Sequence, residues 1–231
     1  GYRYRLQKLK EMGCNSLRLS HNPHAPVLLD LCDEMGILVI SEAYDKWTSQ
    51  YYGGEVPFKK VWKDDLEKFI KRDRNHPSVY LWSVGNEVPQ QLGDFDKKFE
   101  TKGDAADFGA ALLREMVEFT HSIDPSREVT AALFPAREGT QTEWTNWNNH
   151  AEFMQTMPPP MAFQMDVVSW NYTGNLFGVD HKNYPQMKFV ASEASTNLDF
   201  GNRKISMLEF DREHVIGHYY WTALTYLGES S

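Results

Sequence analysis

Residues 72–88 read Arg-Asp-Arg-Asn-His-Pro-Ser-Val-Tyr-Leu-Trp-Ser-Val-Gly-Asn-Glu-Val. Pro77 ends the preceding helix, because proline has no backbone N–H and forces the residue before it out of the helical region. Residues 78–84 are apolar, with β-branched and aromatic side chains, which is typical of a strand buried on both faces. Residues 85–87 then end the run, and we expect the glycine among them to let the backbone turn tightly. The carboxylate of Glu87 therefore stands where a strand stops.

Strands and helices alternate along the whole chain, with no Asn-Gly hairpin between apolar runs. Helical patterns are predicted over residues 1–12, 27–35, 61–74, 104–123, 150–157 and 203–210. Seven predicted strands start near Ser16, Ile37, Ser78, Val129, Val167, Phe189 and Gly217. This alternation favours an α/β fold, in which helices cover a parallel sheet.

A closed (β/α)8 TIM barrel requires about 250 residues. Seven strands in 231 residues predict one domain over residues 1–231, an incomplete barrel that lacks its first strand and its last helix. An open doubly wound sheet is the alternative. That fold would place a glycine-rich phosphate loop after the first strand, where residues 20–23 read Ser-His-Asn-Pro instead.

Composition narrows the class of protein. The chain has 41% apolar and 24% charged residues, and its formal charge is −8 without any basic block. We therefore expect neither nucleic acid nor a membrane as a partner, since no apolar run approaches the roughly 18 residues that a membrane helix needs. The two cysteines, Cys14 and Cys32, form neither a disulfide framework nor a metal-binding spacing, and we expect both to be buried reduced thiols.

Catalytic side chains of barrel enzymes stand at the carboxyl ends of the strands. If all strands point the same way, the side chains that meet there are acidic, aromatic, amide and basic, with no thiol. They are Arg18, His21, Glu42, Asp45, Asn86, Glu87, Tyr172, Glu193 and Trp221.

Two glutamates at two strand ends are what cleavage of a glycosidic bond requires. One carboxylic acid protonates the leaving oxygen, and the other carboxylate stabilises or attacks the sugar carbon. Arg18 at a neighbouring strand end would favour an ionised carboxylate. Tyr172 could donate a hydrogen bond to that carboxylate, and Trp221 could form a floor under a sugar ring.

Each of these residues also has a structural interpretation. His21 could cap a helix or be a satisfied polar group, and Trp221 could belong to the core. Arg18 could be part of a buried structural ion pair, and Glu42 could pair with a nearby arginine. Metal-assisted hydrolysis is disfavoured, because Pro23 separates His21 from His24 and no His-Glu-x-x-His occurs. A serine nucleophile is disfavoured too, since Gly-x-Ser-x-Gly is absent. We expect no metal and no cofactor, and the joint placement of these residues at strand ends favours catalysis.

Three stretches resemble the catalytic barrel of family 2 glycoside hydrolases, most closely its β-galactosidase branch. They are Leu-Arg-Leu-Ser-His-Asn-Pro at 17–23, Leu-Cys-Asp-Glu-Met-Gly-Ile-Leu-Val-Ile-Ser-Glu-Ala at 31–43, and Arg-Asn-His-Pro-Ser at 74–78 followed by Gly-Asn-Glu at 85–87. The resemblance implies a retaining mechanism with Glu193 as the nucleophile and Glu87 as the general acid/base. It implies that Asn86 contacts the 2-hydroxyl of the sugar and that Tyr172 positions the nucleophile.

The same resemblance implies that the terminal sugar is held by His21, Asp45 and Trp221. It also implies that a first barrel strand precedes Gly1 and that β-sandwich domains flank the barrel in a larger enzyme. Thr225 replaces an aspartate of the galactosidase pattern, and residues 42–47 lack a histidine that some galactosidases use. A β-glucuronidase of the same family is therefore an alternative, as is a carbohydrate-binding barrel without catalysis.

Overall fold

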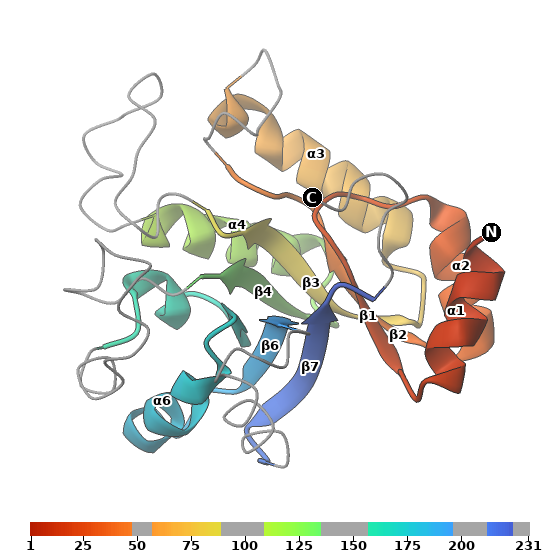
Figure 1. Cartoon of the computed structure of the whole chain (residues 1–231). Coiled ribbons are helices and arrows are strands. Elements are labelled where there is room, and N and C mark those ends of the chain that lie inside the picture. Colours follow the sequence, from red (N-terminus) through yellow and green to blue (C-terminus); the bar gives the residue numbers. More distant parts are fainter. Residues whose placement is uncertain (48–56, 89–108, 135–156, 196–211, 224–231) are drawn as a thin grey trace.

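The computed structural model describes residues 1–47, 57–88, 109–134, 157–195 and 212–223. Its sheet has seven strands in the order β1 to β7, and every neighbouring pair is parallel. The strands are β1 Ser16–Leu19, β2 Leu38–Glu42, β3 Val79–Asn86, β4 Glu128–Leu133, β5 Val168–Asn171, β6 Phe189–Ser195 and β7 Val215–Trp221. The sheet curls toward a barrel, which confirms the predicted incomplete TIM barrel (Figure 1).

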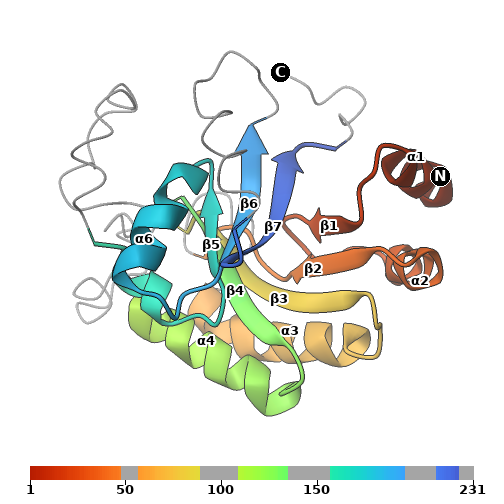
Figure 2. The ribbon, with the colours of Figure 1, turned by 90° about the horizontal axis from the view of Figure 1, so that it is seen from below.

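Helices lie on the outer side of the curled sheet (Figure 2). They are α1 Tyr2–Glu11, α2 Pro26–Met35, α3 Phe58–Asp73, α4 Ala110–Ile123 and α6 Phe177–Asn183, with short 3-10 turns at Pro160–Phe163 and Gly174–Leu176. The helices predicted over 203–210 and most of 150–157 lie outside the described residues, as does the start of the one predicted over 104–123. None of the helices in the described ranges is long and apolar enough to cross a membrane.

Strand β3 runs two residues further than predicted, to Asn86. Gly85 therefore does not turn the chain, and the positive backbone angle belongs to Glu87, whose φ is 43°. The glycine is needed for another reason: a Cβ there would lie 2.8 Å from Nε1 of Trp47, which donates a hydrogen bond of 2.8 Å to the Val84 carbonyl. The close approach of the Trp47 indole, and not a tight turn, excludes a side chain at this position.

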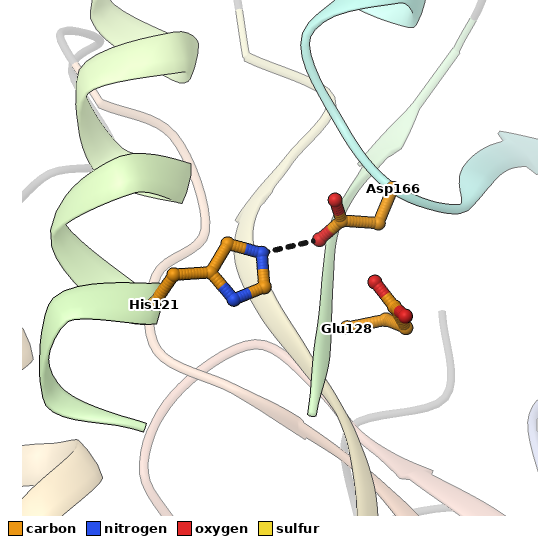
Figure 3. A group of neighbouring side chains, drawn as sticks. All are labelled: His121, Glu128 and Asp166. Carbon is orange, nitrogen blue, oxygen red and sulfur yellow. Dashed lines mark hydrogen bonds and ion pairs between the residues drawn. The ribbon is translucent and has the colours of Figure 1, made fainter. Parts of the chain in front are cut away.

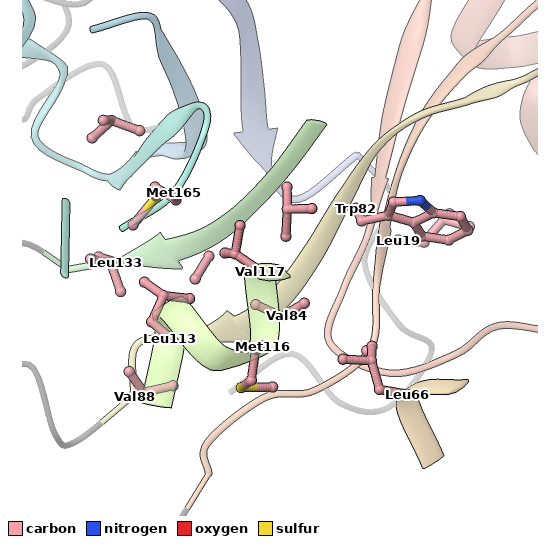
Figure 4. Packing of buried hydrophobic residues seen from close by; sticks show 14 of the residues in the cluster. Leu19, Leu66, Trp82, Val84, Val88, Leu113, Met116, Val117, Leu133 and Met165 are labelled. Atoms are coloured by element: carbon pink, nitrogen blue, oxygen red, sulfur yellow. The ribbon is translucent and has the colours of Figure 1, made fainter. Parts of the chain in front are cut away.

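Apolar side chains fill the space between α4 and the sheet. Leu113, Met116 and Val117 of α4 are buried beside Val84 and Leu133 of the neighbouring strands (Figure 4). Their spacing along α4 follows the helical repeat, which places them on one face. Burial of this face fixes α4 behind β3 and β4, and so fixes the ends of those strands.

The two cysteines differ in environment. Cys32 is fully buried in α2, and burial together with the nearby Asp33 raises the pKa of its thiol to about 11. Cys14 is exposed, so the prediction of two buried thiols is wrong for this residue. It lies in the turn between α1 and β1, where the chain leaves the helix at Gly13 before the strand enters the sheet.

Asp124 ends α4 and ties it to β3 and β4. Its carboxylate accepts hydrogen bonds from Nε1 of Trp82 at 3.0 Å and from Nη1 of Arg127 at 2.7 Å. Burial alone would raise the pKa of Asp124, but these bonds and those from Ser126 outweigh it and lower the pKa to about 2. The ionised form therefore stabilises the fold.

Asp124→Asn is expected to lower the free energy of unfolding by about 2 kcal/mol at pH 7. A lowered pKa contributes stability above the unfolded value of 3.8, and this contribution is lost as the pH falls through about 2. The difference between the two proteins, measured by urea unfolding with tryptophan fluorescence, should thus be smaller near pH 3. Asp64→Asn, at an exposed position of α3, is the control and should change stability by less than about 0.5 kcal/mol. An unchanged difference at pH 3 would contradict this account.

Candidate active site at the carboxyl ends of the strands

Arg18 of β1 lies at the centre of the mouth formed by the strand ends. Its side chain is only 3% exposed, and its guanidinium reaches three other strands. Nη1 donates to Oε1 of Glu193 at 2.9 Å, and Nη2 donates to Oε2 of Glu42 at 2.8 Å and to Oδ1 of Asn86 at 2.9 Å. The guanidinium, which can only donate hydrogen bonds, thus holds side-chain oxygens of Glu193, Glu42 and Asn86 in place.

Glu42 ends β2 and is fully buried. Its Oε1 lies 2.7 Å from Nδ1 of His21, and its Oε2 accepts the Ser83 hydroxyl at 2.7 Å. Burial disfavours the charged forms of Glu42 and Arg18, but their interaction with each other and with neighbouring groups outweighs burial. The pKa of Glu42 is therefore lowered, and the pKa of Arg18 is raised. Arg18 is thus part of a buried ion pair, and Glu42 pairs with an arginine, as their structural interpretations predicted; the same guanidinium also pairs with Glu193.

Glu193 lies within β6, and its side chain is 5% exposed. Besides the Arg18 contact, its Oε1 lies 3.6 Å from Nε2 of His21. Tyr172, which follows β5 with a φ of 61°, donates its backbone N–H to the Glu193 carbonyl at 2.6 Å. Burial and the adjacent Glu193 carboxylate, with which the phenol shares a hydrogen bond, raise the pKa of Tyr172. The phenol therefore stays protonated, and its role in positioning Glu193 stays a prediction.

Glu87 follows β3 and is more accessible, with 29% of its side chain exposed. Its Oε1 accepts a hydrogen bond of 3.0 Å from Nδ2 of Asn171, and its Oε2 lies 3.7 Å from Nζ of Lys46. The two glutamates thus have different surroundings. Glu193 is buried and accepts a hydrogen bond from the guanidinium of Arg18. Glu87 accepts a hydrogen bond from the neutral amide of Asn171, and its side chain is partly exposed to solvent.

Asn86 and Asp45 join the ends of β2 and β3. Nδ2 of Asn86 donates to Oδ1 of Asp45 at 3.0 Å, and the Asn86 backbone N–H donates to the Asp45 carbonyl at 2.8 Å. Lys46 also donates to Oδ1 of Asp45, at 2.8 Å. Asp45 is therefore held beside the predicted acid/base, and one-third of its side chain is exposed.

His21 and Trp221 close the gap between β1 and β7. Their rings are stacked, with centroids 5.1 Å apart and planes 18° from parallel. One face of the Trp221 ring is therefore taken by His21, while both side chains remain partly exposed. The role of Trp221 as a platform for a sugar stays a prediction.

Two residues that contact Glu87 were not predicted from the sequence. Asn171 ends β5 and contacts both Asn86 and Glu87, and Lys46 follows Asp45 and contacts Glu87. A signal for Asn171 existed: it directly precedes Tyr172 at a strand end, as Asn86 directly precedes Glu87. The lysine gave no such signal, because charged residues in loops are usually solvated.

The histidines of the described residues do not bring a metal-binding group to the glutamates. Nε2 of His24 lies 3.1 Å from the carbonyl oxygen of Ser20, so this ring nitrogen is engaged by the backbone and does not form a ligand pair with His21. At the opposite end of the sheet, His121, Glu128 and Asp166 place ligand atoms within 4.8 Å of one another (Figure 3). Nε2 of His121 lies 2.8 Å from Oδ2 of Asp166, and burial and the nearby Asp166 raise the pKa of Glu128. This group lies away from the strand ends that carry the glutamates.

The model of glycosyl hydrolases family 2, TIM barrel domain, matches residues 3–171. The chain belongs to this family. It is 30% identical to the β-galactosidase BoGH2A of Bacteroides ovatus over 97% of its length, and 29% identical to a putative β-glucuronidase of Formosa agariphila over 99%. The crystal structure of a family 2 member from Bacteroides cellulosilyticus superposes with a TM-score of 0.74 at 33% identity, over the whole chain.

These relatives of the family are much longer than this chain. The chain spans 32% of the Bacteroides ovatus enzyme, 23% of the Formosa agariphila protein and 26% of the Bacteroides cellulosilyticus chain. These three relatives therefore carry other parts beside the region that this chain matches.

Proposed function

We propose that this chain is the catalytic barrel of a retaining β-glycosidase, with Glu193 as the nucleophile and Glu87 as the general acid/base. One observation carries the proposal. An unbroken series of hydrogen bonds runs from Glu193 through Arg18, Asn86 and Asn171 to Glu87. This series supports placing both carboxylates in one site, with the enclosed one as nucleophile and the more accessible one as acid/base.

In the first step, Glu193 attacks the anomeric carbon while Glu87 gives a proton to the leaving oxygen. Arg18 donates a hydrogen bond to the attacking carboxylate and so orients it. We expect the phenol of Tyr172, which stays protonated, to help position the same carboxylate. In the second step, Glu87 takes a proton from water, which releases the sugar with its configuration retained. The accessible side of Glu87 provides the path for leaving group and water.

We further propose a terminal β-linked galactose as the sugar. The likeness to the Bacteroides ovatus β-galactosidase over nearly the whole chain supports this assignment. The likeness to the putative β-glucuronidase of Formosa agariphila favours glucuronic acid as the second candidate. Asn86, His21, Asp45 and Trp221 would bind the sugar, and β-sandwich domains of the whole protein would complete the site.

A panel of nitrophenyl β-glycosides tests this assignment on the full-length protein. The galactoside is expected to be cleaved with a kcat/KM at least about tenfold above that of the glucuronide, because a site built for one set of sugar hydrogen bonds rejects the other. Proton NMR of the first product should show the β-anomer. Release of the α-anomer would overturn the retaining mechanism, a preferred glucuronide would overturn the galactose assignment, and binding without turnover would overturn catalysis.

A further inference from the structure

Asn171 is a fully buried amide whose donors and acceptor are all engaged. Nδ2 donates to Oδ1 of Asn86 and to Oε1 of Glu87, each at 3.0 Å, and Oδ1 accepts the Ser192 hydroxyl at 2.6 Å. No side chain in the described ranges other than Asn171 is seen to donate a hydrogen bond to Oε1 of Glu87.

The direction of these bonds is set from Arg18. A guanidinium only donates, so the Asn86 atom that it contacts is the oxygen, Oδ1. That oxygen can accept from Asn171 but cannot donate to it, so the nitrogen of the Asn171 amide must face Asn86. The same nitrogen faces Glu87, and its second N–H therefore points at Oε1. Arg18 thus determines, through two amides, that Oε1 of Glu87 is an acceptor.

The two oxygens of Glu87 are then not equivalent. A proton on Oε1 would compete with the N–H of Asn171 for the same region of the oxygen, whereas Oε2 has no such donor in hydrogen-bonding contact among the described residues. Oε2 lies 3.7 Å from Nζ of Lys46, which is too far for a hydrogen bond.

We propose that Asn171 is a positioning residue that makes Oε2 of Glu87 the oxygen that gives and takes the proton; this inference rests on the proposed function. In the first step the Oε2–H bond breaks and the proton goes to the leaving oxygen. The pair of the C–O bond goes with that oxygen, and Glu193 forms a bond to the anomeric carbon. In the second step a water proton goes to Oε2, the hydroxyl oxygen binds the carbon, and Glu193 leaves with its bonding pair.

The test compares kcat/KM of the full-length protein for two substrates of the same sugar. The dinitrophenolate of a dinitrophenyl glycoside leaves without being protonated. The alkoxide of an alkyl glycoside must be protonated as it leaves. Asn171→Ala, which removes the donor, and Asn171→Asp, which replaces it with an acceptor of the same shape, should each lower kcat/KM for the alkyl glycoside by about 10- to 100-fold. The loss for the dinitrophenyl glycoside should stay below about threefold. Asn183→Asp, the same change at an exposed position of α6, should leave both substrates unaffected.

Purely structural damage would lower both values together, so equal losses on the two substrates would overturn the inference, as would no loss on either. Glu87→Ala is measured in parallel to separate this outcome from failure of the proposed function. If Glu87→Ala shows the leaving-group dependence and the Asn171 variants do not, the positioning role is wrong and the acid/base assignment stands. If Glu87→Ala also lacks it, the acid/base assignment itself fails.

Discussion

Glu193→Ala is expected to lower the turnover of the full-length protein by about four orders of magnitude or more, because no covalent intermediate can form without the attacking carboxylate. The fold should survive the change, since Arg18 keeps its contacts with Glu42 and Asn86 when the 2.9 Å contact with Glu193 is lost. The measurement is the release of nitrophenol from the best glycoside of the panel. Added azide should not restore a β-configured product. Retention requires two successive displacements through a covalent intermediate on Glu193, and this intermediate cannot form in the variant.

Two further variants separate chemistry from packing. Glu193→Gln keeps the shape of the side chain and can still accept a hydrogen bond from Arg18, yet it should lose activity as severely as the alanine variant. Glu213→Gln, the same substitution at an exposed position before β7, should keep the activity of the unmodified protein. Wild-type turnover by either Glu193 variant would end the nucleophile assignment.

Glu87→Ala is expected to show the second-largest effect, and one that depends on the leaving group. For glycosides with poor leaving groups, kcat/KM should fall by about 10²- to 10⁴-fold, since the proton that Glu87 supplies is no longer available. For dinitrophenyl glycosides the fall should be much smaller. Azide should accelerate turnover here and give a β-glycosyl azide, because it attacks the Glu193 intermediate without needing a base.

The control for this prediction is Glu67→Gln on α3, where the glutamate is partly exposed and paired with Lys71. It should leave kcat/KM unchanged for every substrate. Equal losses in Glu87→Ala for good and poor leaving groups would argue against proton donation. They would instead indicate that Glu87 only holds the site together.

Much of the fold is predictable, because strand and helix signals are local. The apolar run before Asn86 and the leucines of the first helix follow the repeats of a strand and a helix, and both elements form where expected. Predictions from the sequence fail where the environment of a residue depends on segments that are distant in the chain. A local pattern indicates a turn at Gly85, but the indole of Trp47 is what excludes a side chain there. Cys14 is expected to be buried, yet the turn that carries it leaves it exposed.

For the candidate site, the rule that parallel strands end at one edge is enough to predict nine side chains. All nine lie in the described residues, and hydrogen bonds, ion pairs or ring stacking join them at the strand ends. Asn171 was not predicted, although it precedes Tyr172 at a strand end as Asn86 precedes Glu87, because its role depends on its hydrogen bonds to Asn86 and Glu87. Its importance appears only from the atoms on either side of it.

The sequence alone determined which side chains stand at the ends of strands, since strand direction and side-chain period are properties of a short segment. Only the tertiary structure decided how these side chains are bonded. Arg18 and Glu193 are 175 residues apart in the sequence, and they form a hydrogen bond because the curled sheet brings β1 near β6. A hydrogen bond acts over about 3 Å and in one direction, so which oxygen accepts and which stays available depends on the barrel as a whole.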